Sequence, residues 1–168
     1  GPKFGAIGME ECLTAAKASP HWNAPLGENQ GRGLACGFWF NIGGTSTVMI
    51  NMNTDGTANL IEGSPDIGGS RASMALMAAE VLGIEAERIK PIIGDTEAVG
   101  FSATTGGSRT TFATGMATIE AARDVVVQVK ERCASMWNVT PDQVEYEDGV
   151  AVNTAGDDKM TLAEVCAQ

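Results

Sequence analysis

The order of apolar and polar residues along the chain predicts a sheet followed by helices. Residues 45–53 alternate between an apolar and a mixed face, and residues 57–62 alternate again after the turn sequence Asn-Thr-Asp-Gly. Residues 34–42 are largely apolar and aromatic, which is typical of a strand. We therefore expect these three segments to form a three-stranded antiparallel meander.

Apolar residues recur at helical spacing in two later segments, each preceded by a glycine pair. The first segment, residues 72–82, is rich in alanine and ends before Gly83, a suitable residue just past a helix end. The second, residues 110–136, repeats apolar residues at intervals of three, four and seven, and it predicts the longest helix of the chain. Between them, residues 88–93 predict a short strand, which Pro91 restricts to an edge or a bulge.

The two ends of the chain add smaller elements. The first 18 residues indicate an exposed lead-in with a short helix, and residues 19–33 form a loop rich in proline and glycine. Residues 144–152 predict a hairpin, and residues 161–168 begin a helix that is still running at the last residue, as in a piece of a longer protein. This order predicts an α+β fold with two layers, in which helices pack on a mixed sheet with an antiparallel start.

Composition excludes several classes of protein. The 168 residues fit one domain, and a net charge of −10 disfavours binding to nucleic acids and to anionic membranes. No apolar run is long enough to cross a bilayer, so we expect a soluble, cytoplasmic protein. The four cysteines are far apart and the only histidine is His21, so we expect reduced core thiols, no zinc site and no hydrolytic triad.

The sequence Gly-Gly-Ser-Arg occurs twice, at residues 68–71 and 106–109, each time at the start of a predicted helix. Glycines allow tight turns, and the amides at a helix start attract anions, so both are candidate anion cradles. Two ordinary capped helices remain the alternative, because the spacing matches neither the P-loop nor the dinucleotide fingerprint. Arg71 and Arg109 either contact a ligand or tie down loops, and Asp66 either orients a ligand or bonds the backbone.

Several motifs follow one another in a fixed order. They are Gly-Ser-Pro-Asp-Ile-Gly-Gly at 63–69, Ala-Ala-Glu-Val-Leu-Gly-Ile at 78–84, Gly-Asp-Thr at 94–96, Thr-Gly-Gly-Ser-Arg at 105–109, Thr-Gly-Met-Ala at 114–117 and Glu-Ala-Ala at 120–122. In this order they resemble the molybdenum-cofactor-binding subunit of the molybdenum hydroxylases. That family includes xanthine dehydrogenases, aldehyde oxidases, molybdenum carbon monoxide dehydrogenases and 4-hydroxybenzoyl-CoA reductase. The resemblance covers residues 10–122 and thins afterwards.

The resemblance implies a cofactor, a reaction and partners. The cofactor is molybdenum on molybdopterin, either plain or as the cytosine dinucleotide. The full enzyme would oxidise an aldehyde, a purine or an N-heterocycle with water as the oxygen source, and FAD and iron–sulfur clusters would lie on partner domains or subunits. Residues 1–168 would be one cofactor-binding domain, a fragment of the large subunit, with a lead-in at 1–33 and an α+β core at 34–168. A non-catalytic interaction or assembly domain of such a complex is the alternative.

The resemblance also implies roles for individual residues. The first stretch matches a family turn, Gly-Gln-Gly, whose glutamine is missing here, so contacts through the backbone are expected. The second stretch matches the segment that holds the pterin and its phosphate, above all through Ser108. The implied cofactor-binding residues are Gly68, Gly69, Ser70, Gly107, Ser108, Arg109, Thr110 and Thr111.

No catalytic and no metal-binding residue is assigned. The glutamate that serves the family as a base belongs to a Gly-Glu motif that this chain lacks. We therefore expect the fragment to be inactive alone. Because its last helix is cut short and its partner half is absent, we also expect it to expose apolar surface and to dimerise or swap elements in isolation.

Overall fold

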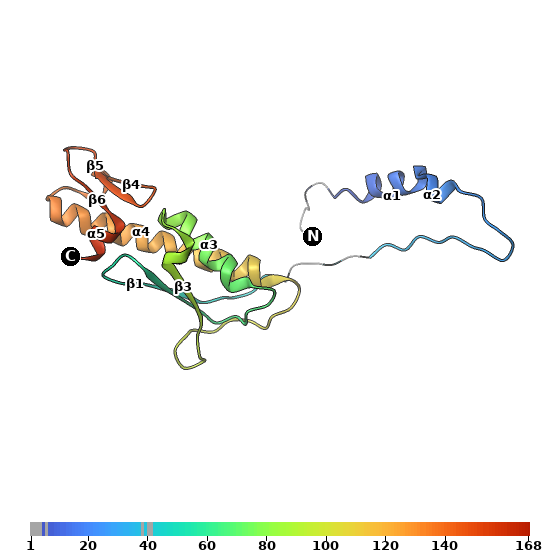
Figure 1. Cartoon of the computed structure of the whole chain (residues 1–168), viewed down its shortest axis with the longest axis horizontal. Coiled ribbons are helices and arrows are strands. Elements are labelled where there is room, and N and C mark those ends of the chain that lie inside the picture. Colours follow the sequence, from blue (N-terminus) through green and yellow to red (C-terminus); the bar gives the residue numbers. More distant parts are fainter. Residues whose placement is uncertain (1–4, 6, 38, 40–41) are drawn as a thin grey trace. The chain divides into compact units, whose positions relative to one another are not determined.

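The computed structural model describes residues 5, 7–37, 39 and 42–168. It divides into two compact units, Gly1–Phe38 and Trp39–Gln168. The first unit holds the helices α1 (Met9–Ala18) and α2 (Pro20–Asn23) (Figure 1). Neither helix has a buried residue. The short helix near the start is thus confirmed, while residues 1–4 and 6 of the lead-in lie outside the described residues. The short helix α2 stands where a loop was expected, because Pro20 occupies its first turn and the Ser19 hydroxyl accepts a hydrogen bond from the Trp22 amide.

The second unit begins with a mixed sheet of three strands in the order β1-β2-β3. Strand β1 (Val48–Met52) runs antiparallel to β2 (Ala58–Glu62), as the alternating pattern predicted. Strand β3 (Ile89–Ile93) runs parallel to β2. Helix α3 (Ser70–Leu82) and the 3-10 turn η1 (Ala86–Arg88) connect these two parallel strands.

The prediction that residues 34–42 form a strand of the meander is wrong. No described residue of segment 34–42 belongs to a strand, and residues 38, 40 and 41 of that segment lie outside the described residues. The third position in the sheet is taken by β3 instead, because a crossover through α3 returns the chain parallel to β2. Pro91 lies in this edge strand, as its missing amide hydrogen requires.

Helices α3 and α4 (Gly115–Trp137) form the second layer, with α3 against β3 and α4 against β1. A π-helical turn, η2 (Thr110–Thr114), precedes α4. The long predicted helix is confirmed. Its apolar repeat gives the buried face correctly at Val129 and Cys133 but not at the start, where Phe112 is 60% exposed and Met116 is 46% exposed. The buried face consists mostly of small residues, which allow close packing against the alanine-rich α3: Thr118, Ala122, Val125, Val129, Cys133 and Ala134.

A second sheet, in the order β4-β5-β6, completes the α+β fold. Its strands are β4 (Val144–Glu147) after the turn η3 (Pro141–Gln143), β5 (Val150–Asn153) and β6 (Lys159–Thr161), and the helix α5 (Leu162–Cys166) follows. The hairpin is confirmed, while β6 was not predicted. Gly83 and Gly149 hold the hairpin against the end of α3, where a Cβ on Gly83 would lie 2.1 Å from the Gly149 nitrogen.

The cysteines are all free thiols, as expected, but they are not all in the core. Cys133 is buried and Cys166 is half-buried, whereas Cys12 and Cys36 are exposed. The expectation of core thiols is therefore wrong for the two that precede the sheet. Cys12 lies on α1, which buries none of its residues, and Cys36 lies outside any helix or strand. No described helix is long and apolar enough to span a membrane.

Candidate functional site

The fold brings the two glycine turns to the same end of the helix pair. Helix α3 contacts both α4 and η2. The Ser64 hydroxyl, before the first turn, lies 2.8 Å from the Thr114 hydroxyl, after the second. One helical turn further on, the Thr118 hydroxyl donates to the Met74 sulfur at 3.5 Å. The start of α3 therefore lies near the start of α4 (Figure 1).

The first turn leaves its backbone open. Gly68 and Gly69 have φ angles of +63° and +80°, and a Cβ on either would meet no atom within 4 Å. Within the described chain, neither amide donates a hydrogen bond. Ser70 differs, because it is buried and its hydroxyl both accepts from the Ile67 amide and donates to the Pro65 carbonyl. The groups free to meet a ligand are therefore the amides of the two glycines.

Asp66 and Arg71 bond to each other across this turn. The Asp66 carboxylate accepts from the Arg71 amide at 3.1 Å and from its Nε at 2.8 Å. The hydrogen bond from the Arg71 amide is the main reason that the pKa of Asp66 lies below its usual value. Of the alternatives left open by the sequence, both residues tie down the loop. The carboxylate also places a negative charge at the start of α3, where it opposes binding of another anion.

The second turn is packed on one side and open on the other. Gly107 has a φ of +56°, and a Cβ there would lie 2.2 Å from the Ile42 side chain. Ser108 also has a positive φ, +55°, which is rare for a residue with a side chain. Its exposed hydroxyl accepts a hydrogen bond of 3.0 Å from the Trp39 indole. This geometry presents Ser108 at the beginning of η2.

Arg109 lies under the second turn rather than on it. Its side chain is 1% exposed, and its guanidinium donates to the carbonyls of Ala103 and Thr45 at 2.8 and 2.7 Å and to the Ser46 hydroxyl at 2.6 Å. It also donates to the carbonyls of Gly43 and Gly44. In the described residues no carboxylate forms an ion pair with it. Arg109 therefore ties two segments together and leaves an uncompensated positive charge below Ser108.

The two threonines after Arg109 differ in exposure. Thr111 is exposed, whereas Thr110 is buried and its hydroxyl has no hydrogen-bond partner in the described chain. Beside them, Ser108 and Thr111 border an apolar hollow. Its other lining residues are Met77, Phe112, Gly115, Met116 and Ile119. An apolar hollow with hydroxyls at its rim suits a ligand that has a flat ring and a polar edge.

A buried carboxyl, which the sequence reasoning missed, lies behind the first turn. Glu62 has no exposed surface, and neither of its oxygens has a hydrogen-bond partner in the described chain. Burial, and next the negative charge of Asp66, raise the pKa of Glu62 to about 7, although the positive charge of Arg71 opposes this. The alternation along β2 could have identified this buried carboxyl, because Glu62 shares the buried face of Ala58 and Leu60.

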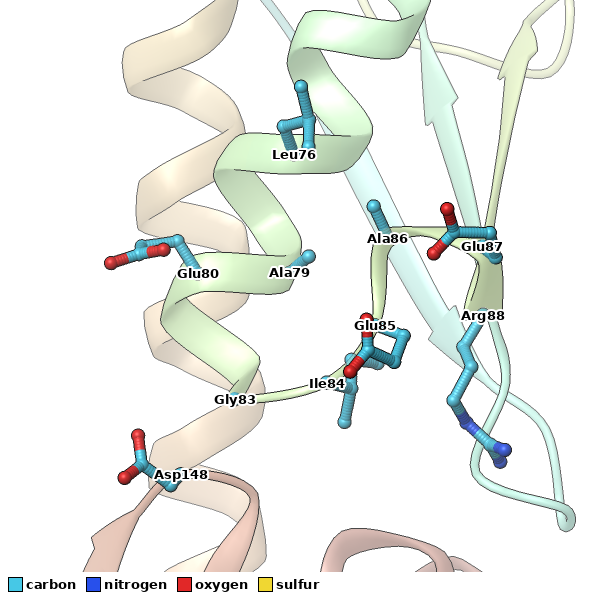
Figure 2. Close-up of a pocket in the computed structure, with 10 residues that line it drawn as sticks. All are labelled: Leu76, Ala79, Glu80, Gly83, Ile84, Glu85, Ala86, Glu87, Arg88 and Asp148. Carbon is cyan, nitrogen blue, oxygen red and sulfur yellow. The ribbon is translucent and has the colours of Figure 1, made fainter.

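Another hollow, of about 650 Å³, lies at the C-terminal end of α3. Figure 2 shows Glu80 and Asp148 on one side of it and Glu87 and Arg88 on the other. Its acidic rim repels anions, and its carboxylates point apart. No described group of three His, Cys, Asp or Glu residues could hold a metal ion. The glycine turns are therefore the better candidate for a binding site.

A family model and several curated relatives match this chain, two of which are molybdenum-binding subunits. The family model, described as the molybdopterin cofactor-binding domain, matches residues 9–168. These two are the molybdenum-binding subunits of aldehyde oxidoreductase, PaoC, from two strains of Escherichia coli. The subunit from strain K12 is 31% identical over 98% of this chain and 23% of its own length. The subunit from O157:H7 is 29% identical over 90% of this chain and 21% of its own length.

A solved structure has the same fold. The crystal structure of a Cu,Mo-CO dehydrogenase, in its carbon monoxide reduced state, matches with a TM-score of 0.70 at 22% identity. The match covers 77% of this chain and 18% of that one. This chain thus spans about a fifth of the length of the curated relatives that it matches.

Proposed function

Because the chain belongs to the molybdopterin cofactor-binding domain family, we propose that its two glycine turns together hold molybdopterin carrying molybdenum. The observation that carries this proposal is that both turns lie at one end of the α3–α4 pair, with free amides on the first and an exposed hydroxyl on the second. When bound, the cofactor supplies the oxidation and reduction chemistry. The residues of this chain bind and orient it.

The charges at the two turns favour different parts of the ligand. Asp66 already places a carboxylate at the start of α3, so the free amides of Gly68 and Gly69 suit a neutral polar edge of the pterin. Ser70, whose amide donates to the Ile67 carbonyl, would support this turn from below. The second turn combines a helix start with the buried positive charge of Arg109, which suits the phosphate. Its contacts would come from the remaining predicted residues: Gly107, Ser108, Thr110 and Thr111.

Arg109 would act indirectly. Its guanidinium forms five hydrogen bonds, all within its own chain, and the residue is only 1% exposed, so the side chain presents no donor to solvent. We assign it the role of holding Ser108 in place and of attracting the phosphate through its charge. The Thr110 hydroxyl, buried and unpartnered, could turn toward a bound ligand.

The whole protein would be the large subunit of a molybdenum hydroxylase, with residues 1–168 as one domain of it. The likeness to PaoC favours an aldehyde as substrate over a purine or an N-heterocycle, with water as the oxygen source. The remainder of the subunit would supply the catalytic base, and partner subunits or domains would carry FAD and [2Fe-2S] clusters. The isolated chain would then be inactive. The cytosine dinucleotide form of the cofactor and a cytoplasmic location complete this proposal.

An assembly or interaction domain of such a complex is the second candidate. It is favoured by the large apolar side chains that remain exposed around the second turn, since Phe101 is 75% exposed and Phe112 is 60% exposed. Exposed apolar patches often mark surfaces that another protein covers.

Cofactor content of the intact parent subunit separates the two candidates. We expect the purified protein to contain molybdenum by elemental analysis and to release a fluorescent pterin. Ser108→Asp would place a negative charge against the phosphate and lower both contents, whereas Val127→Asp, on an exposed part of α4, would not. A folded parent that contains neither metal nor pterin would leave only the assembly role. Full occupancy in the Ser108→Asp protein would remove Ser108 from the site.

A further inference from the structure

The outer edge of β1 offers a surface for another strand. In the part of the chain that the structure describes, the sheet has the order β1-β2-β3, and β1 pairs only with β2. Within the described residues, no backbone hydrogen bond outside that pairing involves residues 48–52. We propose that this edge binds the same edge of a second copy of the chain, with the two β1 strands antiparallel. This proposal does not depend on the cofactor.

The two edges of the sheet are protected to different degrees. Strand β3, at the far edge, contains Pro91, which cannot donate to an added strand, and Lys90, whose charge discourages pairing. Strand β1 has the sequence Val-Met-Ile-Asn-Met, without proline and without charge. Such an edge is a template for a further strand. Among the described residues, the sheet is therefore closed to addition at β3 and open at β1.

A groove of about 390 Å³ follows the open edge. It is lined by residues of β1, α4 and α5, and by none of β2. Ile50, Met52, Val129 and Val165 give it an apolar part, and Asn51, Gln128 and Arg132 give it a polar part. An added strand would extend the sheet and cover these side chains, which gains free energy from both hydrogen bonding and apolar burial.

The occupant that fits is β1 of a second copy. Antiparallel pairing around a two-fold axis at Ile50 sets Met49 of one copy opposite Asn51 of the other, so no like charges meet. The same axis brings the two α4 helices alongside, since Gln128 lines the groove together with Ile50. Asp124 and Arg132 lie four residues on either side of Gln128, so opposite charges face each other across the axis. The surface is thus complementary to itself.

Charge substitutions on the exposed face of β1 test this pairing. The 168-residue chain should sediment as a dimer at high concentration. Those amides of residues 48–52 that point to the outer edge, and so are not bonded to β2, should become protected from hydrogen exchange as the dimer forms. Met49→Lys with Asn51→Lys places two lysine pairs across the axis and should weaken the dimer about tenfold or more. Met49→Lys with Asn51→Asp creates two opposite-charge pairs instead and should preserve it. Ile93→Lys, at the protected edge and as exposed as Met49 (40% against 39%), is the control and should leave the dimer unchanged.

Each result decides the proposal. A chain that stays monomeric up to near-millimolar concentration overturns it and leaves the edge to a strand of different sequence. A dimer that survives the double lysine substitution, or one without protection at 48–52, forms through another surface. Should the double lysine chain fail to fold by circular dichroism, the exchange of the unaltered chain and the Lys–Asp chain still decide the outcome.

Discussion

Ser64 and Thr114 share a hydrogen bond of 2.8 Å between their hydroxyl oxygens, although fifty residues separate them. The Thr114 hydroxyl also lies 2.9 Å from that of Ser46, so three segments of the chain meet at one buried side chain. These segments are the approach to β1, the first glycine turn and the start of the long helix. The relative position of the two turns is thus set by a polar contact beneath them.

Thr114→Val should lower the free energy of unfolding by about 1–3 kcal/mol, because the buried Ser64 hydroxyl loses its partner. Thr114→Ser keeps the hydroxyl and should lose less than the valine protein. Urea denaturation followed by circular dichroism measures both. Equal stability of the valine and wild-type chains would show that the Ser64–Thr114 contact does not hold the turns.

Arg109→Lys should cost about 2–4 kcal/mol of stability, because an ammonium group cannot reach the carbonyls that the guanidinium now satisfies. The control is Arg123→Lys, which changes an exposed pair with Glu120 and should have little effect. Thermal unfolding of the two variants under the same conditions compares them. Similar melting temperatures would contradict the role given to Arg109.

Glu62→Gln should remove part of the pH dependence of stability. The pKa of Glu62 rises from 4.5 to about 7 on folding, so the folded state holds this proton more tightly than the unfolded state. The contribution of this protonation to the free energy of unfolding is therefore full below about pH 4.5. It is lost as the pH rises to about 7, a change on the order of 3 kcal/mol.

The measurement is the difference in unfolding free energy between about pH 5 and about pH 8. We expect this difference to be smaller in Glu62→Gln than in the wild-type chain. Glu80→Gln, on the exposed side of α3, should leave it unchanged. An identical slope in Glu62→Gln would mean that the carboxyl is not held protonated on folding.

Gly107→Ala should destabilise the chain by about 1–3 kcal/mol, since the residue has a positive φ and its new Cβ would collide with Ile42. Gly106→Ala is the matched control, because a Cβ there meets nothing within 4 Å and the φ is not in the positive region. Chemical denaturation of both proteins tests this difference. An unchanged free energy of unfolding in Gly107→Ala would mean that the packed side of the second turn is free to move.

The sequence by itself determined the elements whose signals are local. Alternating residues predicted β1 and β2, the glycine at position 83 marked the end of α3, and Asp148-Gly149 marked the hairpin. Periodicity and turn chemistry act over a few residues, so they can be recognised without knowing the rest of the chain. For the same reason both glycine turns were recognised at the starts of helices.

Only the tertiary structure decided which segments meet. The apolar pattern of residues 34–42 could not reveal that β3 takes the third place in the sheet, because strand pairing depends on where the crossover returns the chain. The direction of the Arg109 donors and the burial of Glu62 likewise depend on residues far away in sequence. Local preference thus specified the two turns, whereas packing between distant segments placed them together and set their charges.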